Sequence, residues 1–166
     1  MSHYLEFFTI GTVNISKMNS DQLRRNRIAN SKDVVVIGVS SGIGWGTTKV
    51  LVSKGFRVFG SVRKQADADR LRREFGDGFV PLVMDVTDAD AVHQAAQKVG
   101  SMIGVRNLVG LVNNAGIVVS GPLLYLRLSE YRRQLEVNTI SPLVVIQASL
   151  LFWERIRRGR VPPAAS

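Results

Sequence analysis

The chain contains no cysteine and only two histidines, so it lacks the residues on which several kinds of functional site depend. Without cysteine there is no disulfide framework, no thiolate metal site and no cysteine nucleophile. The two histidines, His3 and His93, leave almost no material for a histidine-based metal site. We therefore expect a function that uses no metal.

Long apolar runs are also missing. No run approaches the roughly 20 residues that a membrane-spanning helix needs, and the nearest, residues 143–153, is interrupted by Gln147 and Ser149. The N-terminus has neither the cationic start nor the long apolar centre of a secretory signal. We expect a cytoplasmic protein without a membrane span. The alternative is organelle targeting by the Ser-, Asn- and Arg-rich segment 17–32.

Acidic residues are scarce, since 13 Asp and Glu face 22 Lys and Arg and give a formal net charge of +9. Residues 1–32, 33–150 and 151–166 each carry an excess of three positive charges, so two thirds of the excess lies in the two short flanks. A DNA-binding domain would show a basic footprint on the domain itself. We therefore expect no nucleic-acid partner.

From residue 33 onward, short apolar runs alternate with segments of helical periodicity. Strands are predicted over residues 33–38, 57–62, 79–84 and 108–113. Helices are predicted over 42–55, over 66–75, from an N-cap at Thr87 to about 104, and from an N-cap at Ser129 to about Arg158 with a bend at Pro142. The order predicts an α/β fold, a Rossmann-like doubly wound parallel sheet of about four strands with flanking helices.

The alternation gives the expected domain organisation. Residues 33–158 form the predicted dinucleotide-binding domain, preceded by an irregular extension over 1–32. Residues 159–166 are predicted to be an irregular tail, because Pro162 and Pro163 lack the N–H groups that a strand would donate.

The first predicted strand leads directly into the loop Gly-Val-Ser-Ser-Gly-Ile-Gly, residues 38–44, which opens the first helix. Glycines allow a tight turn and a close approach of the backbone to a pyrophosphate, and the N–H groups at the helix start carry partial positive charge. Glycines also occur in such loops for packing alone. Three at this spacing, between a buried strand and a helix, favour a dinucleotide site.

The second predicted strand ends in Val62-Arg63-Lys64, where no carboxylate is present to accept the ribose hydroxyls of a dinucleotide. Two cations at this point favour a 2′-phosphate. We therefore predict NADP(H), with NAD(H) less favoured. The alternative is that Arg63 and Lys64 are solvated loop charges.

The third and fourth predicted strands end in Met-Asp-Val, residues 84–86, and Asn-Asn-Ala-Gly, residues 113–116. Both lie at the carboxyl edge of the sheet, where ligands of such folds bind. Asp85 can accept a hydrogen bond from an adenine amino group or cap the next helix. Asn113 can brace the end of the sheet, and Gly116 can let the chain pass close to a cofactor. Taken singly, each of these residues is better explained by a structural role alone.

Together these motifs resemble the short-chain dehydrogenase/reductase family. The loop matches TGxxxGIG with Ile37 in place of threonine, Asp85-Val86 matches the adenine-binding pair, and residues 113–116 match NNAG over a resemblance covering about 33–158. The resemblance implies an oxidoreductase that transfers hydride between NADP(H) and a carbonyl or alcohol substrate, with Asn138 as the catalytic asparagine. The cofactor-binding residues that follow from the motifs are Gly38, Ser40, Ser41, Gly42, Ile43, Gly44, Arg63, Asp85, Val86, Asn113, Ala115 and Gly116.

The sequence departs from the resemblance in its catalytic residues. The family needs a serine and a tyrosine followed four residues later by a lysine, and no lysine of this chain has tyrosine at that spacing. Residues 159–161 begin like a fifth strand and then give way to prolines, so we expect a fold that is incomplete at its C-terminal half.

Two functions remain open from the sequence. One is a short-chain oxidoreductase whose serine, tyrosine and lysine are missing from this chain. The other is a catalytically inactive nucleotide-binding or interaction fragment. In either case we expect self-association through the long predicted helix 129–158 and the exposed edge of the strand 108–113, because unpaired strand edges and apolar helix faces associate.

Overall fold

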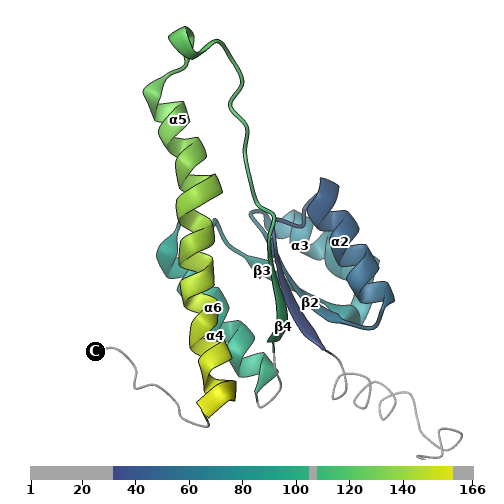
Figure 1. Cartoon of the computed structure of the whole chain (residues 1–166). Helices are drawn as coiled ribbons and strands as arrows, with labels where there is room; N and C mark the ends of the chain where they lie inside the picture. The colour runs from purple at the N-terminus through teal and green to yellow at the C-terminus, as the bar shows by residue number, and fades with distance from the viewer. Residues whose placement is uncertain (1–31, 105–107, 159–166) are drawn as a thin grey trace, which may run out of the picture. The chain divides into compact units, whose positions relative to one another are not determined.

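The computed structural model describes residues 32–104 and 108–158, with residues 151–158 described by their backbone alone (Figure 1). The predicted tail 159–166 and all but Lys32 of the predicted extension 1–32 lie outside the described residues. In chain order, the elements are β1 (Asp33–Ile37), α2 (Gly42–Ser53), β2 (Arg57–Val62), α3 (Gln65–Phe75), η2 (Gly76–Gly78), β3 (Phe79–Val83), α4 (Ala89–Ile103), β4 (Leu108–Asn113), η3 (Leu123–Tyr125), α5 (Leu128–Leu135), η4 (Glu136–Ile140) and α6 (Ser141–Arg158).

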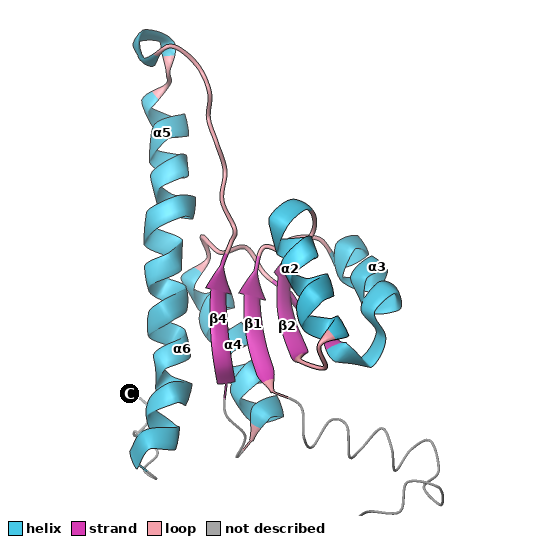
Figure 2. Ribbon diagram, turned by 45° about the vertical axis from the view of Figure 1, so that its right-hand side comes forward, coloured by secondary structure: helices cyan, strands magenta, loops and turns pink. Residues whose placement is uncertain are grey.

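The strands form one parallel sheet in the order β3-β2-β1-β4, with α2 and α3 on one face and α4 and α6 on the other (Figure 2). Crossover helices connect the parallel strands, as such a sheet requires. The predicted α/β fold with a doubly wound parallel sheet is confirmed.

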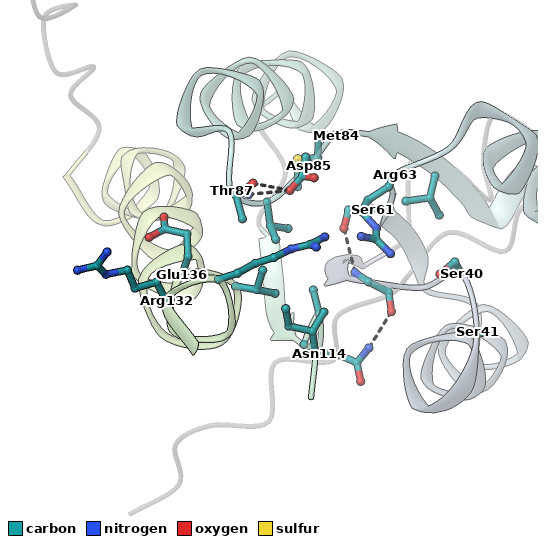
Figure 3. Close-up of a pocket in the computed structure, with 18 residues that line it drawn as sticks. Ser40, Ser41, Ser61, Arg63, Met84, Asp85, Thr87, Asn114, Arg132 and Glu136 are labelled. Atoms are coloured by element: carbon teal, nitrogen blue, oxygen red, sulfur yellow. Dashed lines mark hydrogen bonds between the residues drawn. The ribbon is translucent and has the colours of Figure 1, made fainter. Parts of the chain in front are cut away.

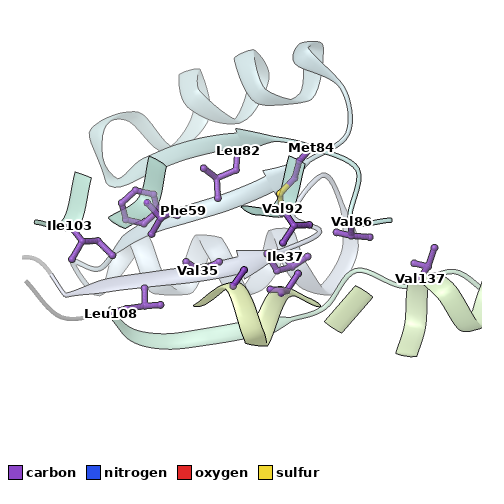
Figure 4. Close-up of a cluster of buried hydrophobic side chains, with 13 residues drawn as sticks. Val35, Ile37, Phe59, Leu82, Met84, Val86, Val92, Ile103, Leu108 and Val137 are labelled. Carbon is purple, nitrogen blue, oxygen red and sulfur yellow. The ribbon is translucent and has the colours of Figure 1, made fainter. Parts of the chain in front are cut away.

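Alternation along β1 explains why all of its residues after Asp33 are apolar. Val35 and Ile37 belong to the core on the α4 and α6 side (Figure 4), whereas Val34 and Val36 belong to the core on the α2 and α3 side. Successive side chains of a strand point to opposite faces, so a strand covered on both sides needs apolar residues at consecutive positions. This sandwiched strand ends at the edge where the site lies.

The predicted helix over residues 129–158 is interrupted. A π-helical turn, η4, separates α5 from α6 and ends two residues before Pro142. Proline has no N–H to donate to the carbonyl four residues earlier, which here is that of Asn138. Within the π-helical turn, Ser141 Oγ donates to the Glu136 carbonyl at 2.8 Å. The predicted irregularity at the proline is therefore a wide turn that precedes it.

Both predicted N-caps are wrong by a residue or more. Helix α4 is capped by Asp88, whose carboxylate accepts from the Ala91 N–H at 3.0 Å, while Thr87 bonds elsewhere. Helix α5 begins before Ser129, and Arg127 occupies the N-cap position without a side-chain cap. Whether a residue caps a helix depends on its backbone angles. The sequence does not show which of two neighbouring polar residues, such as Thr87 and Asp88, has the angles of an N-cap.

The described part of the chain leaves apolar surface uncovered at β4 and α6. Strand β4 pairs with β1, and no other described strand lies at its outer edge. Leu143, Ile146 and Leu150 of α6 are 52, 40 and 45% exposed. Self-association through this edge and helix stays a prediction. Among the helices of the described ranges, none is both long and apolar enough to cross a membrane.

Candidate functional site

An open cavity of about 640 Å³ lies at the carboxyl edge of the sheet, where the loops after β1, β2, β3 and β4 meet the α5 and η4 segment (Figure 3). Eight of the residues singled out in the sequence line it: Gly38, Ser40, Ser41, Arg63, Asp85, Val86, Ala115 and Gly116. Within the described ranges, no group of three or more His, Cys, Asp or Glu residues is placed to hold a metal ion.

The first glycine of the loop is held from two sides. The Gly38 N–H donates to Ser61 Oγ at 2.9 Å, and the Gly38 carbonyl accepts from Asn114 Nδ2 at 2.7 Å (Figure 3). Its φ of +81° favours glycine, and a Cβ there would lie 2.7 Å from Ala115 Cα. A Cβ on Gly44 would lie only 2.0 Å from the Gly38 carbonyl oxygen. The glycines thus let the loop, the start of α2 and the end of β4 pack together.

The remaining candidates lie outside the lining of the cavity. Gly42 supplies a turn with φ +60°, Ile43 is 80% exposed, and Gly44 is buried beneath the loop. Asn113 is exposed at the end of β4 and borders a separate small pocket. The asparagine that bonds to the glycine loop is its neighbour Asn114.

Asn138 lies in η4 and binds the chain that follows β4. Its Oδ1 accepts from the Ile117 N–H at 2.9 Å, and its Nδ2 donates to the Ile117 carbonyl at 2.8 Å. A Cβ on Gly116 would come within 3.5 Å of Asn138 Oδ1. The side-chain amide therefore fixes the segment at one wall of the cavity through both its donor and its acceptor.

Several lining residues are absent from the sequence-based candidates. Ser61, Asn114 and Thr87 bond within the site, and Arg133 comes from α5. A serine near the end of β2, between Gly60 and Val62, was a signal for Ser61, because buried polar side chains need partners. The resemblance placed Asn138 of the same predicted helix at the site, but it did not indicate that Arg133 would line the cavity, since that depends on how the helix packs.

Asp85 is an ionisable group of the cavity whose pKa is lowered by its surroundings. Its Oδ1 accepts from the Thr87 N–H at 2.9 Å and from Thr87 Oγ1 at 2.8 Å (Figure 3). These two hydrogen bonds lower the pKa of Asp85, and the charges of Arg63 and Arg133 lower it further. Among the described residues, none bonds to Oδ2. The cavity therefore presents an ionised carboxylate with an oxygen available to accept a hydrogen bond.

Replacement of Thr87 by valine tests this account. In Thr87→Val, we expect the pKa of Asp85 to rise toward its ordinary value of 3.8 without reaching it, because the backbone N–H bond remains. A carboxylate whose pKa is lower in the folded state stabilises the fold at pH values above its unfolded-state pKa. This stabilisation is lost as the pH falls through the folded-state pKa. The variant should therefore lose less stability on acidification. Carboxyl-carbon NMR titration, with Thr47→Val as control, measures the shift, and an unchanged pKa would contradict it.

A family model described as short chain dehydrogenase matches residues 32–166. An NADPH-dependent 3-dehydrocapnine reductase of Ornithobacterium rhinotracheale is 40% identical over 119 residues, covering 72% of this chain and 41% of the reductase. Human retinol dehydrogenase 5 is 34% identical over 139 residues, covering 83% of this chain and 43% of that enzyme.

Solved structures give the same picture. An NADPH-bound carbonyl reductase from chicken fatty liver superimposes with a TM-score of 0.66 at 29% identity, covering 72% of this chain and 50% of that one. A Serratia marcescens short-chain dehydrogenase/reductase mutant superimposes with a TM-score of 0.66 at 32% identity, covering 72% and 49%. The chain thus spans half or less of the length of these relatives.

Proposed function

The chain belongs to the short chain dehydrogenase family, and we propose that it binds NADP(H) in the cavity as part of an oxidoreductase acting on a carbonyl or alcohol. The observation that carries the proposal is the meeting of the glycine loop, Arg63 and Asp85 at one edge of a parallel sheet. The names of the NADPH-dependent reductase and the NADPH-bound carbonyl reductase support the choice of cofactor.

The residues present fit a dinucleotide. Close packing at Gly38 and Gly44 brings the backbone near the place of a pyrophosphate, beside the first turn of α2. Arg63 supplies a cation for a 2′-phosphate, and Asp85 Oδ2 can accept from the adenine amino group. When bound, NADP(H) supplies or accepts the hydride. The chain's own part in this proposal is to bind and orient the cofactor.

We assign Asn138 the place of the family's catalytic asparagine. Its amide holds Ile117 through two hydrogen bonds, so this residue also keeps the segment after β4 against η4. The sequence contains no tyrosine four residues before a lysine. A group other than a tyrosine–lysine pair within these 166 residues must therefore donate the proton to the substrate oxygen, or accept it from there.

Cofactor choice is tested by titrating the protein with NADPH and NADH and following the fluorescence of the reduced nicotinamide. We expect tighter binding of NADPH, and a loss of about tenfold for NADPH but little for NADH in Arg63→Gln, because a charged hydrogen bond to the 2′-phosphate is removed. Arg72→Gln, which removes a charge from α3, serves as control. Equal or tighter binding of NADH by the unaltered protein would refute the preference.

A second candidate is a catalytically inactive nucleotide-binding fragment, which the missing tyrosine–lysine pair favours. Reductase assays on this chain, with NADPH and a panel of aldehydes and ketones, separate the two. Binding of NADPH without oxidation would support the second candidate. Sustained oxidation that depends on the carbonyl compound would exclude it.

A further inference from the structure

Arg70 of α3 reaches the glycine loop, although it lies 30 residues further along the chain. One of its terminal nitrogens donates to the Ser40 carbonyl at 2.6 Å. Helices α2 and α3 lie side by side on the same face of the sheet (Figure 2). The bond therefore joins the loop before α2 to the neighbouring helix.

Two carboxylates of the same helix hold the guanidinium in this position. Asp67 lies 3.3 Å from the nitrogen that binds Ser40, and Glu74 lies 3.6 Å from the other terminal nitrogen. Glu74 also accepts from Trp45 Nε1 at 3.0 Å, which ties the group to α2. The Arg70 side chain is 45% exposed, so these ion pairs contribute little to stability. Their clearer effect is to fix where the guanidinium points.

The bond has a geometrical consequence for the next peptide group. In a planar trans peptide, the C=O of one residue and the N–H of the next point in opposite directions. Ser40 lines the cavity, whereas Arg70 is not part of the lining. A Ser40 carbonyl turned toward Arg70 is therefore turned away from the cavity, and the Ser41 N–H is turned the opposite way.

The orientation of this peptide matters because the ligand is anionic. Backbone N–H groups attract phosphate oxygens, while a carbonyl oxygen at the same place repels them. Ser41 occupies the N-cap of α2, and its hydroxyl makes no capping bond with the described helix residues. The N–H groups at this end of the helix thus keep their partial positive charge for a ligand.

We propose that Arg70 is a positioning residue that fixes the Ser40–Ser41 peptide with its N–H toward the phosphates of the dinucleotide and its carbonyl away from them. The identity of the anion rests on the proposed function. The orientation of the peptide does not, because it is set by contacts within the chain. Arg70 therefore acts on cofactor affinity without touching the cofactor.

The test uses Arg70→Met, which keeps most of the apolar stem but removes every donor, and Arg70→Lys, which keeps a donor. Arg72→Met is the matched control, since Arg72 lies on the same helix and its side chain has no hydrogen bond or ion pair to the described residues. Two measurements are made on each folded variant: the Ser40 carbonyl-carbon and Ser41 amide-nitrogen NMR shifts without ligand, and the Kd for NADPH.

In Arg70→Met we expect both shifts to move. The Kd should rise about tenfold if the peptide keeps the binding orientation in only about a tenth of the molecules. Arg70→Lys should show smaller changes in both, and Arg72→Met should resemble the unaltered protein. Unchanged shifts in Arg70→Met, or a Kd no higher than that of Arg72→Met, would overturn the proposal. If the unaltered protein binds no NADPH, the proposed function fails, while the shifts still decide the orienting role of Arg70.

Discussion

Gly44→Ala is expected to abolish measurable NADPH binding and to lower the free energy of unfolding by about 2 kcal/mol. The new Cβ would lie 2.0 Å from the Gly38 carbonyl oxygen and 2.5 Å from Asn114 Nδ2. The nearer atom belongs to the backbone, so the loop itself must move. Overpacking costs about 1–3 kcal/mol, and we expect the upper end here because the clash is with backbone. The gain of about 1 kcal/mol from replacing a helical glycine by alanine leaves a net loss of about 2 kcal/mol.

Gly46→Ala is the matched control for this change. Gly46 lies two residues along the same helix, and a Cβ there would meet nothing within 4 Å. It should keep NADPH binding and gain up to about 1 kcal/mol from helix propensity. Urea unfolding and NADPH titration measure both effects. If Gly44→Ala were as stable as Gly46→Ala and bound NADPH equally, the packing account of the loop would be wrong.

Asp33→Ala should destabilise the fold by about 3–5 kcal/mol, because it leaves a buried guanidinium without its carboxylate. Arg57 Nε lies 2.6 Å from Asp33 Oδ1, and the two side chains are 8 and 0% exposed. Arg57 also donates to the Met102 carbonyl at 3.2 Å and lies over the Phe59 ring. It therefore cannot turn to solvent without breaking further contacts.

Two comparisons make this second prediction specific. The double variant Asp33→Leu with Arg57→Met should recover most of the lost stability, because buried pairs are often replaced by apolar residues at little cost. Glu130→Gln, which breaks the exposed pair with Arg127 at 2.7 Å, should have little effect. Thermal and urea unfolding report the differences. A loss in Asp33→Ala no larger than in Glu130→Gln would show that the buried pair does not hold the strands.

The sequence by itself determined the sheet and the family. The run of residues 34–37, too short for a helix and apolar at every position, fits only a strand covered on both faces. The glycines of the loop were equally informative, because few other folds need them between a strand and a helix. The resemblance to short-chain dehydrogenases is confirmed by the family match over residues 32–166.

Only the tertiary structure decided which side chains meet at the site. Asn114 rather than Asn113 reaches Gly38, Ser61 receives the Gly38 N–H, and Arg70 holds Ser40. These bonds join residues 76, 23 and 30 positions apart. Such pairings depend on strand order and helix packing, which local periodicity does not encode. The motifs therefore identified a dinucleotide loop, and the packing of the sheet and helices set its shape.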